Sequence, residues 1–225
     1  KKEGIGALLS EGTLAMARAF GREESEAAQI KGMEIPMHDP RAFHGMAISY
    51  ATGPRGACHL KGDYYSVDLG TAVPEYMILP GDRLSSEGKG VSAAKYQSVK
   101  DLYDALTLCK FSPLSVTQIC AALNAVTGWD VTPEEFLVTG DRSINIKRAI
   151  NNLLGLGREH DTLPRICTTP LEEGSTAGTA PDLDGMLREY YAWRGWDWDT
   201  GRPMRERLVS LGLSRQAADL YGELS

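Results

Sequence analysis

The densest group of chemically capable side chains is the stretch RGACHLK, which runs from Arg55 to Lys61. Arg55 and Lys61 can bind phosphate or another anionic group, and His59 can exchange a proton near neutral pH. Gly56 has no side chain, so a ligand can approach the backbone closely there. The same stretch also fits a plain loop whose basic side chains cover the end of the preceding helix. Spacing alone favours the plain loop.

A second group follows in the stretch DALTLCK, where Asp104 and Cys109 lie at the end of a helical pattern. The carboxylate could accept hydrogen bonds from an amino-bearing ring, and a thiolate there could ligate iron. One cysteine cannot hold an iron–sulfur cluster by itself. Without further context, the pattern favours a solvated aspartate and an ordinary buried cysteine.

The other cysteines and histidines offer little chemistry. Cys58 and His59 are adjacent, which is not the spacing of zinc ligands, and the chain contains no second pair. We therefore predict that Cys58 is a small buried side chain, like Cys120 inside its apolar helical pattern. The remaining histidines lie beside charged or turn residues, where we expect surface or capping roles: His38, His44 and His160.

Helices must position these residues, because apolar side chains recur at helical spacing along most of the chain. The predicted helices cover residues 6–20, 39–50, 92–108, 115–126, a long stretch starting at 133, 183–193, 203–211 and 214–220. Asp39 and Ser214 are predicted N-caps, and Thr132 with Glu135 forms a capping box. Residues 28–35 are expected to be extended, 62–90 to be loops with short helical turns, and 168–181 to be a polar linker.

The composition limits the class of protein. The 225 residues are 42% hydrophobic and 24% charged, with a net charge of -6. The sequence contains no basic patch that would favour binding to nucleic acid or to an anionic membrane surface. It also contains no apolar run of the roughly 20 residues that a membrane helix needs. The widely spaced cysteines favour a reducing cytoplasm. The fold predicted from the pattern is mainly α, with a boundary near residues 82–92.

Beyond these patterns, the chain resembles the tungsten-containing aldehyde:ferredoxin oxidoreductase family. The resemblance is carried, in order, by EGIGALLSEG, KGMEIPMHDPR, SYATGPRGACHLKG, DALTLCKF, HDTLPRICTTPL, LREYYAWRGWDWDTGRP and ERLVSLGL. The family has an N-terminal β domain and two helical domains, with the cofactor between them. The resemblance implies two packed helical domains here: residues 1–90 as a partial second domain with a loop-rich end, and residues 91–225 as the third.

The resemblance also assigns roles to individual residues. Matching cofactor-binding positions are Arg55, Gly56 and Lys61 at the pterin, and Asp104, Leu108, Cys109 and Lys110 in a pterin-binding loop written DxxGLC. Cys109 would be the fourth thiolate of a [4Fe–4S] cluster. His59 matches the histidine near tungsten and would hydrogen-bond or protonate the substrate oxygen. The chain departs from the pattern at Thr107, where glycine is typical.

The resemblance implies a parent enzyme that oxidises aldehydes to carboxylic acids with tungstopterin and passes electrons through the cluster to ferredoxin. The other three cluster cysteines, the first pterin loop, a glutamate near the metal and the β domain are missing from this sequence. We therefore expect a piece of a longer polypeptide, without bound cofactor and inactive alone. The alternatives are a fragment of a same-family tungsten reductase acting on an aromatic acyl-CoA, or a helical module without catalysis.

Overall fold

The computed structural model describes residues 2–222, and these form a mainly α structure, as the sequence predicts. The helices are α1 (Ile5–Leu9), α2 (Gly12–Ala19), α3 (His44–Ala51), α4 (Tyr65–Asp68), α5 (Lys89–Ala105), α6 (Val116–Thr127), α7 (Pro133–Leu153), α8 (Arg165–Thr168), α9 (Leu183–Arg194), α10 (Arg205–Ser210) and α11 (Ser214–Tyr221). Strands β1 (Gln29–Ile30) and β2 (Met33–Glu34) pair in a small antiparallel hairpin. Among the described helices, none is both long enough and apolar enough to cross a membrane.

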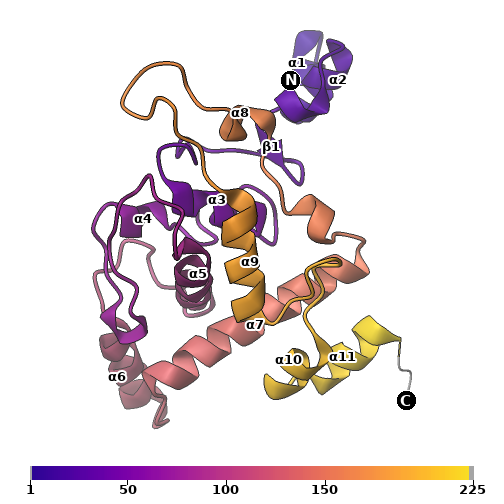
Figure 1. Cartoon of the computed structure of the whole chain (residues 1–225). Coiled ribbons are helices and arrows are strands. Elements are labelled where there is room, and N and C mark those ends of the chain that lie inside the picture. The colour runs from indigo at the N-terminus through magenta and orange to yellow at the C-terminus, as the bar shows by residue number, and fades with distance from the viewer. Residues whose placement is uncertain (1, 223–225) are drawn as a thin grey trace.

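Helix α5 lies at the centre of the molecule and packs against α3, α7 and α9 (Figure 1). The contact with α7 is close because residue 140 is a glycine. A Cβ atom at Gly140 would lie 2.2 Å from the carbonyl oxygen of Ser98 on α5. The main hydrophobic cluster runs from Ile30 to Trp196, so it draws on both sides of the domain boundary predicted between residues 90 and 91. The boundary itself stays a prediction.

A buried polar network joins α5, α7 and α9. Arg194, with no exposed side-chain area, donates to Asp141 Oδ1 at 2.5 Å and to Ser98 Oγ at 2.7 Å. Trp196 donates from Nε1 to Asn145 Oδ1 at 2.8 Å. Trp196, two residues after the end of α9, is thereby joined to α7. A buried guanidinium is tolerated only with such partners, so the network fixes how the three helices meet.

Capping boxes start the two helices that flank the turn after α6. Thr132 accepts from Glu135 N at 3.2 Å while Glu135 accepts from Thr132 N at 3.0 Å, as predicted. Ser115 and Gln118 form the same arrangement at α6. Each box satisfies two backbone N–H groups that would otherwise lack partners at the helix start.

Three predictions about helix starts and continuity are wrong. The helix predicted over residues 6–20 is divided into α1 and α2, because Ser10 Oγ bonds the Ala7 carbonyl at 2.8 Å and Gly12 has a φ of 87°. Asp39 does not start α3. Its carboxylate accepts from Arg41 N at 2.9 Å in a preceding turn, and α3 begins at His44. Ser214 is the first residue of α11 and makes no capping bond.

Candidate functional site

The two chemically capable stretches meet at Asp104. The Lys61 ammonium group bonds Asp104 Oδ2, and the Lys110 ammonium group lies 2.9 Å from Asp104 Oδ1. Burial opposes ionisation of this carboxyl, but the bonds from both lysines outweigh it, so the pKa of Asp104 lies below its usual value. The structure thus brings together side chains 43 residues apart in the sequence.

The segment that follows Asp104 is tied back onto α5 by two lysines. Lys100 Nζ donates to the Lys110 carbonyl at 2.9 Å, and Lys110 Nζ donates to the Lys100 carbonyl at 2.5 Å. Leu108 is half-buried and packs against the core, whereas Cys109 is exposed. The expectation of a buried cysteine, drawn from the helical pattern alone, is therefore wrong for Cys109, because the residue lies in a surface loop after the helix.

The loop that carries the first stretch is anchored from both sides. Asn151 of α7 donates from Nδ2 to the Pro54 carbonyl at 2.8 Å. Gly56 has a φ of 99°, and a Cβ atom there would lie 2.5 Å from the Ile30 carbonyl oxygen. Arg55 is exposed and donates to the sulfur of Cys58, which is buried as predicted. The glycine is therefore required by the packing of this loop on β1, whatever ligand it contacts.

His59 is partly exposed and has a neighbour that sequence reasoning missed. The His38 ring centroid lies 5.4 Å from that of His59, and the His38 ring stacks on Tyr65 at 3.9 Å. His38 is itself partly exposed, in keeping with the surface role expected for it, but its contacts with the two rings were not expected. In hindsight, the only signal was its place in the stretch KGMEIPMHDPR, which does not reveal which rings meet.

The two other histidines differ in their surroundings. His44 is only 4% exposed, and its Nδ1 lies 3.0 Å from Ser86 Oγ, so the surface role expected for it is wrong. His160 accepts from Gly157 N at 3.1 Å and so caps a turn, as predicted. Neither residue contacts the groups at Asp104.

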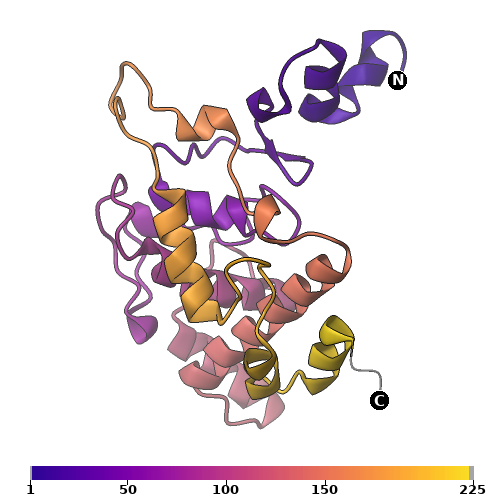
Figure 2. The same cartoon turned by 45° about the vertical axis from the view of Figure 1, so that its right-hand side comes forward.

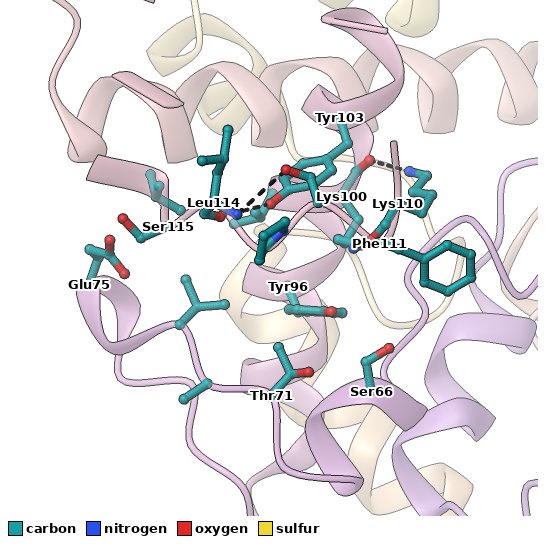
Figure 3. Close-up of a pocket in the computed structure, with 16 residues that line it drawn as sticks. Ser66, Thr71, Glu75, Tyr96, Lys100, Tyr103, Lys110, Phe111, Leu114 and Ser115 are labelled. Atoms are coloured by element: carbon teal, nitrogen blue, oxygen red, sulfur yellow. Dashed lines mark hydrogen bonds between the residues drawn. The ribbon is translucent and has the colours of Figure 1, made fainter. Parts of the chain in front are cut away.

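A cavity of about 370 Å³ lies beside the Lys110 segment (Figure 3). Tyr96, Tyr103 and Phe111 contribute rings to its wall, and Lys100 Nζ lies 4.5 Å from the centroid of the Tyr103 ring. Burial lowers the pKa of Lys100, although the carboxylate of Asp63 counteracts it. The cavity is large enough for a small organic ligand.

The comparisons with known proteins identify the family. The family model described as "Aldehyde ferredoxin oxidoreductase, domains 2 & 3" matches residues 1–213. The chain belongs to the aldehyde ferredoxin oxidoreductase family. It is 36% identical over 218 residues to the tungsten-containing aldehyde ferredoxin oxidoreductase of Pyrococcus furiosus, and 37% identical over 217 residues to that of Pyrococcus abyssi. Each match covers 95% of this chain, and the chain spans about 35% of the length of either relative.

The fold is also found in a solved structure. The chain is similar, with a TM-score of 0.69, to a chain of the active-site complex BamBC of benzoyl-coenzyme A reductase in complex with 1,5-dienoyl-CoA. The similarity covers all of this chain and 39% of the other, at 18% sequence identity. At that identity the comparison supports a shared fold alone.

The side chains of the site fit the cofactors that the family resemblance implies. Arg55, Lys61 and Lys110 are cations of the kind that binds phosphate, and Asp104 is an acceptor between the two lysines. Cys109 offers an exposed thiol. Within residues 2–222, no group of three or more His, Cys, Asp or Glu side chains could hold a metal ion. An iron–sulfur cluster bound at Cys109 would therefore need thiolates from outside the described residues.

Proposed function

We propose that this chain is the helical part of a tungstopterin-dependent aldehyde:ferredoxin oxidoreductase of the cytoplasm, which oxidises aldehydes to carboxylic acids. The observation that supports this function best is the meeting of the two family-matching stretches at Asp104, where Lys61 and Lys110 both bind its carboxylate. The resemblance implies that both stretches contact one pterin, and their meeting at Asp104 supports that arrangement. The meeting makes one face of the chain suitable for an anionic cofactor.

Each residue of that face has a distinct task in the proposal. Arg55, Gly56 and Lys61 contact the pterin from one loop, and Asp104, Leu108 and Lys110 contact it from the other. Cys109 ligates one iron of a [4Fe–4S] cluster. When bound, tungstopterin and the cluster supply the two-electron chemistry and the path to ferredoxin.

The reaction also has a proton balance that the chain's own groups must serve. Oxidation of an aldehyde with water yields a carboxylic acid, two electrons and two protons. His59, partly exposed on the same loop as Lys61, holds or releases a proton at the substrate oxygen. This role needs an imidazole that is reachable from solvent and fixed by its loop.

The remainder of the parent polypeptide completes the site. The relatives are almost three times as long as the part matched by this chain, which leaves room for a β domain that carries the other cluster thiolates. We propose that the isolated chain binds neither tungstopterin nor the cluster. Tungsten bound in stoichiometric amount by the isolated chain would contradict this.

Aldehyde oxidation is preferred over reduction of an aromatic acyl-CoA. Relatives at 36–37% identity are named aldehyde ferredoxin oxidoreductases, whereas the benzoyl-coenzyme A reductase chain shares 18% identity. Proteins that share only 18% identity can have the same fold and different activities, so this similarity does not indicate the reaction.

The deciding experiment uses the full-length parent protein with short-chain and aromatic aldehydes, benzoyl-CoA and a viologen acceptor. Aldehyde-dependent viologen reduction is the expected result. Cys109→Ser should lower the iron content and abolish electron transfer, while Cys120→Ser, which changes a buried core thiol, should leave the iron content unchanged. Full iron content and activity in Cys109→Ser would rule out the role of Cys109, and turnover of benzoyl-CoA alone would favour the reductase.

A further inference from the structure

We propose that His38 is a second imidazole of the site, paired with His59 so that a proton on one ring disfavours a proton on the other. The pairing is a property of this chain, and only its use in catalysis rests on the proposed function. His38 would be a positioning residue that acts through His59.

The position of His38 is determined by contacts on several sides. Its ring stacks on Tyr65 with an interplanar angle of 13°, and its backbone carbonyl accepts from the Tyr50 hydroxyl at 3.1 Å. The ring of His59 lies at 5.4 Å between centroids, tilted by 38°. The segment between β2 and α3 therefore presents the His38 ring to the loop that carries His59.

One nitrogen of His38 lacks a partner. His38 Nδ1 is buried and makes no hydrogen bond with any described residue. Buried polar atoms in folded proteins are nearly always paired, so an unpaired imidazole nitrogen calls for an explanation. An acceptor nitrogen kept available for a proton explains it.

The charges around His38 favour its neutral form. Burial lowers the pKa of His38 most, the neighbouring His59 lowers it further, and Asp63 counteracts both. Asp63 is also 3.3 Å from Lys100 Nζ, so part of its charge is already compensated. On the segment of His38 itself, Asp39 is paired with Arg41 at 2.6 Å. Asp63 is therefore the one charge among these that favours the protonated form of His38, and burial and His59 outweigh it.

Two imidazoles at this separation repel each other when both are protonated, so a positive charge on one ring disfavours a positive charge on the other. One ring is then a proton donor while the other stays an acceptor. In a reaction that releases protons, a neutral acceptor beside His59 keeps that residue able to give and take a proton.

The pairing is tested on the 225-residue chain by NMR titration of the histidine rings, which needs no cofactor. In His59→Gln the pKa of His38 should rise by about half a unit or more, since a like charge is removed. In Asp63→Asn it should fall. The matched control is His160→Gln, which changes a partly exposed histidine whose partners are Gly157 and Glu159 and should leave His38 unmoved.

The unaltered chain provides a second measurement that does not depend on a variant's folding. Each ring's resonances should show two inflections, one from its own titration and one from its neighbour's. A single inflection for both rings, or an unchanged His38 in a folded His59→Gln chain, would overturn the pairing. In the loaded parent, His38→Gln should shift the pH profile of kcat/KM without changing tungsten or iron content. An unchanged pH profile of kcat/KM would rule out a catalytic role for the pair but not the proposed function.

Discussion

Thr107 occupies a backbone position that suits glycine. Its φ is 55°, in the left-handed region, and it directly follows Leu106, the C-cap residue of α5. Thr107 N donates to the Asp104 carbonyl at 3.2 Å, and Leu108 N donates to the Tyr103 carbonyl at 2.8 Å. This pair of bonds is the Schellman motif, whose first residue beyond the cap is usually glycine. The glycine of the family's DxxGLC loop therefore has a backbone explanation, and Thr107 keeps the same geometry at a cost.

The first prediction concerns that cost. A β-branched residue in the left-handed region costs about 1–2 kcal/mol, so Thr107→Gly should be neutral or stabilise the chain by up to about 1 kcal/mol after the added freedom of the unfolded glycine is counted. Urea denaturation followed by circular dichroism measures it. The matched control is Gly128→Thr at the end of α6, where φ is 74°, and it should destabilise the chain. Equal destabilisation in both variants would contradict the strain at Thr107.

A second prediction at the residue scale concerns the thiols. Cys109 is exposed, whereas Cys58, Cys120 and Cys167 are buried. Burial raises the pKa of Cys167 to about 11, so that thiol stays protonated at pH 8. An aromatic disulfide reagent should therefore modify Cys109 rapidly in the native chain and the other three only on unfolding.

The control for this reaction is a pair of serine variants. Cys109→Ser should remove the rapid phase, and Cys120→Ser should preserve it. A rapid phase that survives in Cys109→Ser would show that a buried thiol is reached through local opening.

The family resemblance implies that the two stretches converge on one pterin. The ion pair between Lys61 and Asp104 was beyond sequence reasoning, because nothing in either stretch specifies a side-chain partner 43 residues away.

At the scale of elements, the β1–β2 hairpin inserts a cation into the core. Lys31 and Gly32 have φ values of 52° and 81°, as a two-residue turn of type I′ requires. Lys31 Nζ reaches Asp161 Oδ1 at 2.8 Å and the Ala51 carbonyl at 2.5 Å. Asp161 also binds Arg148 of α7 and the Tyr191 hydroxyl of α9. The network thereby attaches the hairpin to α7 and α9.

The third prediction removes the centre of this network. Asp161→Asn leaves Lys31 and Arg148 as buried cations without their counter-ion, which should cost about 3–5 kcal/mol. The control, Asp184→Asn, breaks exposed pairs with Arg158 and Arg188 and should cost at most about 1 kcal/mol. Urea denaturation at pH 7 measures both. Similar losses in the two variants would show that the buried network stabilises no more than a surface pair.

Asp161→Asn should also change how the stability of the fold depends on pH. Burial opposes ionisation of Asp161, but Lys31 and Arg148 outweigh it, so its pKa lies below the ordinary aspartate value. A carboxyl with a lowered native-state pKa stabilises the fold above its unfolded pKa and loses this contribution as pH falls through the native value. Stability should therefore fall less steeply between pH 5 and pH 3 in Asp161→Asn than in the unaltered chain (roughly the range where aspartate titrates).

The elements themselves were largely predictable, for a physical reason. Capping boxes depend on four consecutive residues, and Thr132 to Glu135 contain all the information needed. Asp39 and Ser214 carry suitable side chains, but the structure places them in a turn and inside a first helical turn. Each of these side chains can also form other local hydrogen bonds. Which bond forms depends on tertiary contacts that a single sequence does not display.

For the molecule as a whole, α1 and α2 stand apart from the packed body (Figures 1 and 2). Neither helix contributes a residue to either of the two hydrophobic clusters found among the described residues. The link between α2 and the hairpin includes the bond from Thr13 N to Glu34 Oε1 at 2.9 Å. Apolar side chains remain exposed here, with Ile5 at 66% and Phe20 at 59%. The sequence predicts a helix in this region, but not that it packs outside the core.

The last prediction follows from this separation. Because few buried contacts hold α1 and α2, their amides should exchange with deuterium through local opening, well before those of α5, α7 and α9. Ile144→Ala, which removes a buried side chain of α7, should cost about 2–5 kcal/mol and accelerate exchange in α5, α7 and α9. It should leave exchange in α1 and α2 unchanged, since their opening does not require the core to open. If α2 instead exchanges at the rate of α5 and accelerates with it in Ile144→Ala, the N-terminal helices belong to the same cooperative unit as the core.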